Sequence, residues 1–278
     1  MFLGYNTNGL AHHDLFDAVT LLAEIGYRGV AITIDHGALS PRDPNVWKQV
    51  SELKRLLKKL GMRSVIETGG RFLLDPRVKH EPTLLSPERQ RRIDFYKHAV
   101  DCAAELESDC VSLWSGALHE PLSHDAAMDR LVEGLRETLD YAAARNVAIG
   151  FEPEPGMFID TMRAFDELLA RLDRAGPGLT LDIGHLECQG ETPIAGVIRR
   201  WANRLVNVHI EDMRAGRHEH LMFGEGAIDF PPVLRALAES GYAGGVYVEL
   251  SRHGHLGGEA ARQAMAFLRA NVPVDESA

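Results

Sequence analysis

The second half of the chain contains four short apolar runs, and each is followed by a side chain that can bind a metal ion or transfer a proton. These side chains are Glu152, Asp182, His209 and Glu249. The intervals between them are 30, 27 and 40 residues, each close to the length of one strand plus one helix. Three carboxylates and one imidazole suit a hard or borderline divalent cation such as Mn²⁺, Mg²⁺, Co²⁺ or Zn²⁺. Since the set has no thiolate, a closed structural zinc site is disfavoured. Any one of these acids could be an exposed loop carboxylate, but four at corresponding positions favour a shared site for one divalent ion.

The segments that position these residues alternate between strand and helix along the whole chain. Apolar and β-branched runs predict strands at 2–6, 28–35, 63–68, 110–116, 147–155, 178–185, 205–212 and 244–251. Helical spacing of apolar residues predicts helices at 15–27, 45–62, 86–106, 126–146, 161–173, 192–204, 229–242 and 258–272. Such alternation implies right-handed crossovers and a parallel sheet. Eight units without a linker predict an α/β fold, a single (β/α)8 TIM barrel domain over residues 1–278, with 272–278 as a flexible polar tail.

A doubly wound open sheet is the alternative architecture. That fold usually carries a glycine-rich phosphate turn after its first strand. Here the first strand ends in YNTNGL, which lacks such a turn. The barrel is therefore the better prediction.

Polar residues gather where the expected strands end, and active sites of barrels lie at that end. Glu67 ends the third strand and Trp114 the fourth, while Glu154 follows Glu152 by two residues and shares its face if the strand continues. Residues 69–86 form the longest irregular stretch, and loops of this length are often functional lids. We expect this loop to cover a pocket in which Trp114 stacks on a substrate that Glu67 and Glu154 also contact. The alternatives are that Trp114 packs at the barrel rim and that Glu154 is exposed there.

Composition limits the partners. The formal net charge is −10, which disfavours nucleic acid because phosphate neutralisation requires Lys and Arg. The chain has only three cysteines, no membrane-length apolar stretch and no basic start followed by an apolar run. We expect a cytoplasmic protein with a small-molecule substrate and with no nucleic-acid or membrane partner.

Several motifs resemble those of a known family. The segments LDIGH, VHIEDM, HLMFGEGAIDF and VYVEL are similar to the sugar phosphate isomerase/epimerase superfamily, the xylose isomerase-like barrels. That group includes ketose 3-epimerases, inosose dehydratases, hydroxypyruvate isomerase and endonuclease IV. The resemblance covers essentially the whole chain, is strongest over 147–252, and has its most specific signature in GEG-x-IDF at 224–230.

The resemblance implies a metal-dependent isomerase or epimerase acting on a small sugar or another polyhydroxylated carbonyl compound. Glu152, Asp182, His209 and Glu249 would hold the metal, and Glu152 and Glu249 would also move the proton through an enediolate. A lyase that dehydrates an inosose or keto-sugar could use the same site. Many relatives are dimers or tetramers, so a homo-oligomer is compatible with the resemblance.

The resemblance also implies substrate contacts beyond the metal ligands. His185 would contact the substrate or support a ligand. His220 matches a histidine near the substrate, with His218 as its rival because the local match can slide by two positions. Arg217 or Arg214 would hold a hydroxyl or phosphate group.

Two other functions are weaker. An endonuclease IV-like phosphodiesterase needs three zinc ions and extra histidines at the early strand ends, but these ends read VIETGG and SLWSGA. A non-catalytic barrel would not need the complete candidate ligand set.

Overall fold

The computed structural model describes residues 1–172 and 176–271. The predicted tail, 272–278, lies outside this range. In the described residues, eight parallel strands form a closed barrel in the order β1-β10-β7-β6-β5-β4-β3-β2. The strands are β1 (Phe2–Asn6), β2 (Gly29–Thr33), β3 (Arg63–Glu67), β4 (Val111–Leu113), β5 (Ile149–Phe151), β6 (Gly178–Asp182), β7 (Leu205–Ile210) and β10 (Gly245–Val248). The predicted TIM barrel is confirmed.

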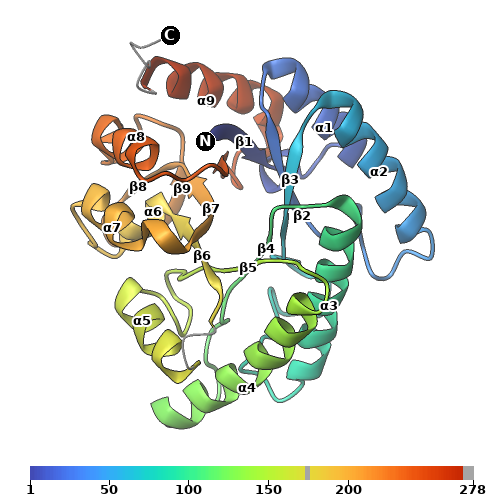
Figure 1. Ribbon diagram of the computed structural model, residues 1–278, viewed down its shortest axis with the longest axis vertical. Coiled ribbons are helices and arrows are strands. Elements are labelled where there is room, and N and C mark those ends of the chain that lie inside the picture. Colours follow the sequence, from blue (N-terminus) through green and yellow to red (C-terminus); the bar gives the residue numbers. More distant parts are fainter. Residues whose placement is uncertain (173–175, 272–278) are drawn as a thin grey trace.

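Helices surround the barrel in chain order, so that α9 returns beside α1 (Figure 1). They are α1 (Leu15–Ile25), α2 (Val46–Leu60), α3 (Arg89–Leu106), α4 (His124–Ala143), α5 (Met162–Arg171), α6 (Ile183–Cys188), α7 (Ile194–Trp201), α8 (Phe230–Glu239) and α9 (Gly257–Asn271). Short 3-10 turns lie at Thr7–Leu10, Ala202–Arg204 and Gly254–Leu256. The ring of helices leaves the strand ends as the place where side chains from many units can meet.

Local sequence explains how individual helices begin and end. Helix α1 begins after Asp14, whose Oδ1 accepts hydrogen bonds from the backbone N–H groups of Phe16 and Asp17 at 2.8 and 3.3 Å. It ends at Gly26, which adopts a left-handed φ of 107°. These two residues explain why the helix predicted at 15–27 lies at Leu15–Ile25.

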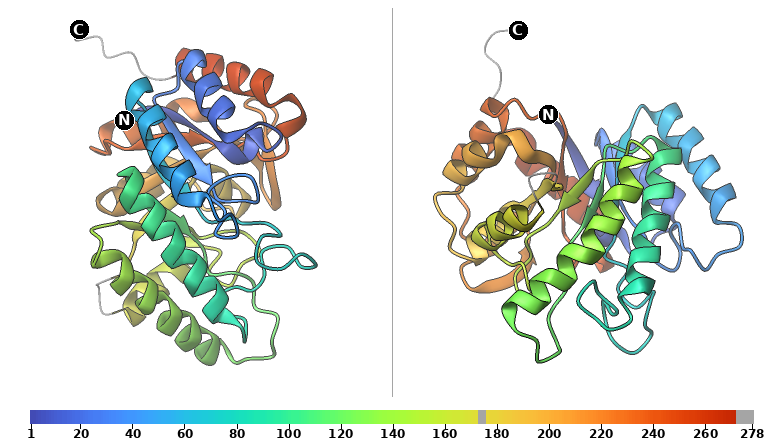
Figure 2. Two further views of the ribbon diagram at one scale, coloured as in Figure 1. Left: turned by 90° about the vertical axis from the view of Figure 1, so that its right-hand side faces the viewer. Right: turned by 60° about the horizontal axis from the view of Figure 1, so that its bottom comes forward.

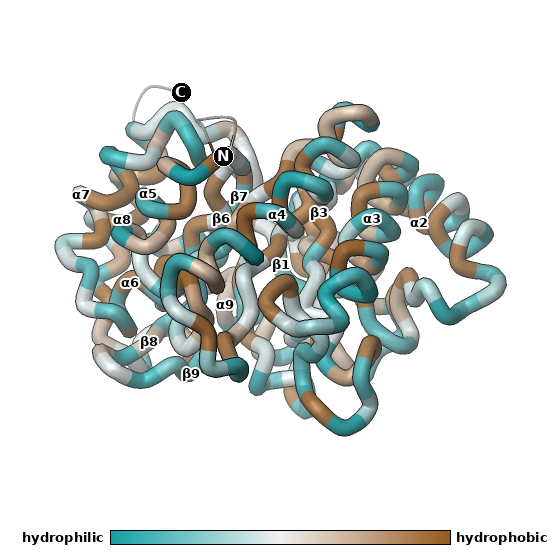
Figure 3. The backbone as a smooth tube through the Cα atoms, turned by 90° about the horizontal axis from the view of Figure 1, so that it is seen from below, coloured by the Kyte–Doolittle hydropathy of each residue, from teal (hydrophilic) through white to brown (hydrophobic). Residues whose placement is uncertain are grey.

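Each outer helix buries one face against the barrel. In α2, the buried residues Val46, Val50, Leu53 and Leu57 recur at helical spacing. The hydrophobic and hydrophilic segments that alternate along α2 in Figure 3 reflect this pattern. Its lysines lie on the solvated side, so the basic run at 54–60 belongs to the outer face of an amphipathic helix.

Three local features differ from the sequence prediction. The sixth strand ends at Asp182 rather than continuing to 185, because the Asp182 side chain accepts from the His185 backbone N–H at 2.8 Å and caps α6. Helix α3 begins at Arg89 rather than at 86, and Ser86 does not cap it, because the Ser86 Oγ accepts a hydrogen bond from the Thr83 backbone N–H at 2.9 Å instead. An antiparallel hairpin of β8 (Asp212–Arg214) and β9 (Arg217–Leu221), which the sequence did not predict, follows the seventh barrel strand.

The long segment between β3 and α3 projects beyond the barrel end, as the teal loop in the left view of Figure 2 shows. In the described ranges, no helix is both long enough and apolar enough to cross a bilayer.

Candidate metal centre and substrate cavity

The barrel brings the four predicted metal-binding residues together. Glu152, Asp182, His209 and Glu249 each offer one ligand atom, and these atoms all lie within 4.8 Å of one another. Neighbouring strand pairing explains part of this convergence, because Asp182 and His209 are register partners on β6 and β7. The set is almost fully enclosed, with only Glu249 classed as partly exposed.

The two ring nitrogens of His209 face different partners. Its Nδ1 lies 3.1 Å from Glu152 Oε1 and 3.0 Å from Glu249 Oε2. Its Nε2 lies 2.9 Å from Glu67 Oε1, which also accepts a hydrogen bond from Asn207 Nδ2 at 3.0 Å. A carboxylate at Nε2 favours the tautomer with the proton there, which leaves the Nδ1 lone pair for a metal ion. The structure therefore places Glu67, predicted as a substrate contact, directly against the candidate ligand His209.

The electrostatics of the cluster favour bound positive charge. Burial alone would lower the pKa of His209, but Glu67, Glu152 and Glu249 outweigh it and raise that pKa well above the usual value. Burial opposes ionisation of Glu249 too, yet the facing His209 imidazole lowers the pKa of Glu249. Burial raises the pKa of Glu152 well above its usual value, and the neighbouring Glu249 adds to this effect. One positive charge on His209 cannot balance the several carboxylates that surround it. A divalent cation would supply the missing positive charge.

An unpartnered oxygen supports the fit to a metal ion. Asp182 is 2% exposed, and its Oδ2 has no hydrogen-bond partner among the described residues, while its Oδ1 caps α6. An unpaired buried carboxylate oxygen is costly, and coordination to a cation removes that cost.

Glu249 is held in place by Asn8, whose Nδ2 donates to Glu249 Oε1 at 2.7 Å. The donor set therefore fits one divalent ion.

A cavity of about 390 Å³ opens above this cluster at the strand ends. It is lined by residues from the strand ends, the loop after β3 and the β8–β9 hairpin. They are Asn6, Asn8, Thr33, Glu67, Thr68, Gly69, Arg71, Lys79, His80, Ser112, Trp114, Glu152, Glu154, His185, His209, His218, His220, Glu249, Ser251 and Arg252. The size and the largely polar wall suit a small hydroxylated molecule.

Five further predicted substrate contacts can be placed against this cavity. His185, His220 and Glu154 line it, and so does the rival His218, so the two candidate histidines of β9 both face the site. Arg217 does not line it and is exposed at the start of β9. Because side chains alternate along a strand, residues 218 and 220 share one face and residue 217 takes the other. Arg217 therefore lies outside the cavity wall in this structure, and its contact with a substrate group stays a prediction.

Trp114, the fifth predicted contact, is only 5% exposed although it lines the cavity. The His80 ring stacks on it with centroids 5.2 Å apart, and the Arg92 guanidinium lies 5.0 Å from its ring. Much of the indole is thus covered by the protein itself.

The loop after β3 is held by one buried arginine. Arg92 of α3 is fully buried and donates to the carbonyl oxygens of Thr68, His80 and Pro82 at 3.2, 2.7 and 2.8 Å. These three carbonyls lie at the two ends of the loop, so one guanidinium ties its ends together. The loop places Arg71, Lys79 and His80 in the cavity wall.

The GEG-x-IDF signature has a structural role around Asp212. The Asp212 carboxylate accepts hydrogen bonds from the backbone N–H groups of Gly224, Gly226 and Ile228 at 2.9, 2.9 and 3.2 Å. A Cβ atom on Gly226 would lie 2.1 Å from Asp212 Oδ1, so only glycine fits there. This network fixes the segment that returns from the β8–β9 hairpin to α8.

The sequence analysis missed three residues that shape the site. Asn207 and Glu211 flank His209 at two-residue intervals and are fully buried. The sequence could have indicated them, because apolar and polar residues alternate in VNVHIE and this alternation places positions 207, 209 and 211 on one face of the strand. Arg252 lines the cavity just after the last strand and had no comparable signal.

These features define a TIM barrel with a carboxylate-rich candidate cation site at its strand ends. A family model described as xylose isomerase-like TIM barrel matches residues 19–271, and the chain belongs to this family. The predicted superfamily and the prediction of an enzyme are thereby confirmed.

The three relatives described next are between 17% and 25% identical to this chain. The chain is 25% identical to inosose dehydratase from Lacticaseibacillus casei, over 94% of this chain and 91% of that protein. Its fold is similar to a solved L-ribulose 3-epimerase, with a TM-score of 0.78, 17% identity, and coverage of 98% and 94% of the two chains. It is also similar to the IolI protein solved with a zinc atom, with a TM-score of 0.76, 21% identity and 98% coverage of each chain.

Proposed function

We propose that this protein is a divalent-metal-dependent isomerase or epimerase acting on a small sugar or other polyhydroxylated carbonyl compound. The observation that carries the proposal is the placement of Glu152 and Glu249. They come from strands separated in the barrel by β6 and β7, yet both lie about 3 Å from the same nitrogen, with 3.1 and 3.0 Å to His209 Nδ1. Both also line the cavity.

Two carboxylates that approach from different strands can serve the two faces of one substrate carbon. A proton on a carbon next to a carbonyl is only weakly acidic, and a bound divalent ion would supply the positive charge that stabilises the resulting enediolate. One glutamate then removes the proton and the other returns a proton to the opposite face, which inverts that carbon. Asn8 orients Glu249 for this role through its hydrogen bond to Oε1.

The other residues of the cavity would bind and orient the substrate. Imidazoles of His185, His218 and His220 and the cations Arg71, Lys79 and Arg252 line the cavity. Hydroxyl groups and carbonyl oxygens are the natural partners of these donors.

A dehydratase is the second candidate function. The favouring observation is a further carboxylate, Glu154, which lines the cavity two residues after Glu152. After the same proton abstraction, an acid at this position could protonate a departing β-hydroxyl group. The similarity to an inosose dehydratase agrees with this alternative.

The test is proton exchange in deuterated water. Purified protein loaded with Mn²⁺, Co²⁺, Mg²⁺ or Zn²⁺ is incubated with ketoses, inososes and hydroxypyruvate, and products are followed by NMR and mass spectrometry. Deuterium on the carbon next to the carbonyl in an epimer or isomer supports the first proposal, and loss of one water molecule supports the second. Turnover that persists in chelator and in both Glu152→Gln and Glu249→Gln would overturn both.

A further inference from the structure

A second cavity of about 310 Å³, called the rim cavity below, lies beside the first at the same end of the barrel. Most of its wall comes from the segments that follow β1 and β2, within residues 7–18 and 33–38. Asn8, Thr33 and Arg71 line both cavities. The two cavities therefore share a wall that these three residues form.

Arg71 is the movable part of this wall. Thr33 is fixed, because its Oγ1 donates to Asn6 Oδ1 at 2.7 Å, and Asn8 is fixed by its hydrogen bond to Glu249 Oε1 at 2.7 Å. The Arg71 guanidinium makes one hydrogen bond within the described ranges, to the Asn8 carbonyl oxygen at 3.2 Å, and no ion pair there. A long side chain with one such bond can change its rotamer at little cost. A ligand in the first cavity can thus extend into the rim cavity past Arg71.

The rim cavity combines an apolar base with polar groups at its edge. Leu10, Leu15 and Ala18 line it, and none of them is more than 4% exposed. The exposed His13 and His36 also line it, and their rings make no hydrogen bond to any residue that the structure describes. A sugar ring has C–H groups on its faces and hydroxyl groups around its edge, so it matches both parts of the wall.

Two carboxylates make an anionic group a poor occupant. Asp14 and Asp35 both line the rim cavity, and Arg71 is its one cation among the described residues. Carboxylate oxygens accept hydrogen bonds from hydroxyl groups but repel a phosphate or a second carboxylate. The charge of the wall therefore favours a neutral polyol over a charged ligand.

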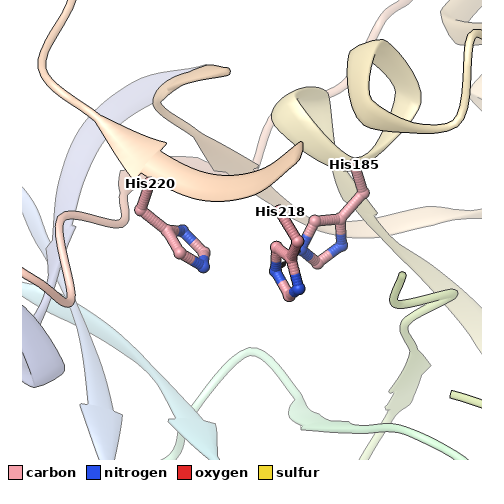
Figure 4. Close-up of side chains that lie close together, drawn as sticks. All are labelled: His185, His218 and His220. Carbon is pink, nitrogen blue, oxygen red and sulfur yellow. Dashed lines mark hydrogen bonds between the residues drawn. The ribbon is translucent and has the colours of Figure 1, made fainter. Parts of the chain in front are cut away.

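An extension on the side of β4 and β5 is less favourable. A cavity of about 290 Å³ adjoins the first cavity there and shares His80 and His218 with it. The His80 ring is held by stacking on Trp114, with centroids 5.2 Å apart. His218 lies against His185, with centroids 4.8 Å apart, and the His220 ring is turned toward them (Figure 4). These wall residues are fixed by packing, whereas Arg71 is not.

We propose that the rim cavity binds a second sugar ring, so that the substrate is a keto-sugar that carries a glycosyl substituent. This inference rests on the proposed function, because it places the reacting carbon of the keto-sugar beside Glu152 and Glu249. The substituent then passes Arg71, packs one face on the apolar base and directs hydroxyl groups to His13 and His36. Each cavity has the size of a pocket for one small ring.

The test compares D-fructose with four disaccharides in which a glucosyl group is attached to fructose. These are turanose, maltulose, leucrose and isomaltulose, which are substituted at the third, fourth, fifth and sixth oxygen of fructose. Calorimetric titration of the Mg²⁺-loaded protein measures the dissociation constants. At least one disaccharide is expected to bind about tenfold more tightly than D-fructose, because the added ring gains its own contacts. Saturation-transfer NMR is expected to show its glucosyl protons in contact with the protein.

Variants that fill the rim cavity test where the glucosyl ring lies. Gly37 and Ala38 line the cavity, and a Cβ placed at Gly37 meets no described atom within 4 Å. Gly37→Trp and Ala38→Trp are each expected to reduce the preference for the disaccharide over D-fructose by about tenfold. Ala117→Trp, which narrows the cavity on the side of β4 and β5, is the matched control and is expected to keep that preference. Circular dichroism and melting temperature establish that each variant is folded.

Three results overturn the proposal: no disaccharide binds more tightly than D-fructose, the glucosyl protons of the wild-type complex receive no saturation, or the preference responds equally to Ala117→Trp and to the two rim variants. The NMR result on the wild type decides the matter even where a variant does not fold. Proton exchange on unsubstituted ketoses without any gain from a glucosyl group removes the rim site and leaves the proposed function intact. A glucosyl ring bound in the rim cavity without proton exchange on any sugar would do the reverse.

Discussion

Glu67 Oε1 lies 2.9 Å from Nε2 of His209, although the two residues are 142 positions apart in the chain. The contact joins the end of β3 to β7 across the barrel interior. Its effect is to present the opposite nitrogen of His209 to Glu152 and Glu249. A residue of the first half of the chain therefore orients His209, a candidate metal ligand in the second half.

Removing the charge of Glu67 is expected to weaken metal binding. We predict that Glu67→Gln lowers metal affinity by about tenfold and Glu67→Ala by up to about 100-fold, because the histidine loses the partner that fixes its tautomer. Competition with a chromogenic chelator measures the affinity. Glu154→Gln, which changes a cavity carboxylate that does not contact His209, is the control. Equal affinities in all four proteins would show that Glu67 has no part in orienting His209.

Metal removal is expected to lower thermal stability. Saturating metal at about 100 times its dissociation constant contributes about 2.7 kcal/mol to the free energy of unfolding, which corresponds to about 5–10 °C for a chain of this size. Differential scanning calorimetry with and without chelator measures the shift. The same treatment of a Glu152→Gln/His209→Ala variant is expected to give a clearly smaller shift. A wild-type melting temperature that chelator leaves unchanged would argue against the carboxylate-rich site.

Arg92 is expected to control the stability of the loop after β3. In Arg92→Met, three backbone carbonyls lose their donor, and the predicted loss in the free energy of unfolding is about 3 kcal/mol or more. Urea denaturation measures the loss, and limited proteolysis between residues 69 and 86 reports on the loop itself. Arg89→Met is the control on the same helix, since Arg89 makes only an ion pair with the largely exposed Glu133 and should cost under about 1 kcal/mol. Similar losses in the two variants would contradict the role of Arg92.

Gly226 is expected to tolerate no side chain. Because a Cβ there would lie 2.1 Å from Asp212 Oδ1 and 2.6 Å from the Met213 backbone nitrogen, Gly226→Ala should cost about 2–4 kcal/mol by displacing the Asp212 network. Gly216→Ala is the control within the hairpin. No described atom lies within 4 Å of a Cβ placed at Gly216, so that only the positive φ of 70° opposes the substitution. Chemical denaturation compares the two. A smaller loss in Gly226→Ala than in Gly216→Ala would show that the contact is easily relieved.

His80 is expected to make stability depend on pH. Burial, aided by the nearby cations Lys79, Arg92 and Arg71, lowers the pKa of His80 to about 3. The unfolded chain, with a histidine pKa of about 6.5, then binds more protons than the folded protein between pH 3 and 6.5. Stability is therefore lost as pH falls through 6.5, by at most about 2 kcal/mol at pH 5.

The comparison uses His80→Asn, because asparagine tolerates the positive φ of 68° at this position. The urea midpoints of the wild type and the variant are measured at pH 7 and at pH 5. The difference between the two proteins is expected to be smaller at pH 5. If the wild type and the variant lose the same stability over this range, His80 is not the responsible group.

Much of the barrel could be predicted because its signals are local. Apolar runs of strand length and capped amphipathic helices follow each other without interruption, and each strand-end acid lies one unit from the next. Glu152, Asp182, His209 and Glu249 were found in this way, and the structure brings their ligand atoms together. Their roles in binding and proton transfer remain predictions.

The misses have physical causes. Arg217 was expected at the cavity from the family resemblance alone, and the polar β8–β9 segment gave no strand signal that would have shown which of its side chains face inward. Helix α3 was predicted to begin at 86, but the Ser86 Oγ accepts from the Thr83 backbone N–H, a partner that only the folded loop provides. The role of Arg92 was not predicted, because its three partners are backbone carbonyls, which leave no pattern in the sequence.

The hydrogen bond from Asn8 to Glu249 has a consequence for how the site forms during synthesis. It joins the segment after the first strand to the end of the last one, and β1 pairs with β10. A nascent chain can therefore assemble most of the barrel wall, but it cannot complete the carboxylate-rich site until its final strand has left the ribosome and closed the ring. Binding of the proposed metal ion is accordingly expected to be a late event in folding, because a chain that ends before β10 lacks Glu249.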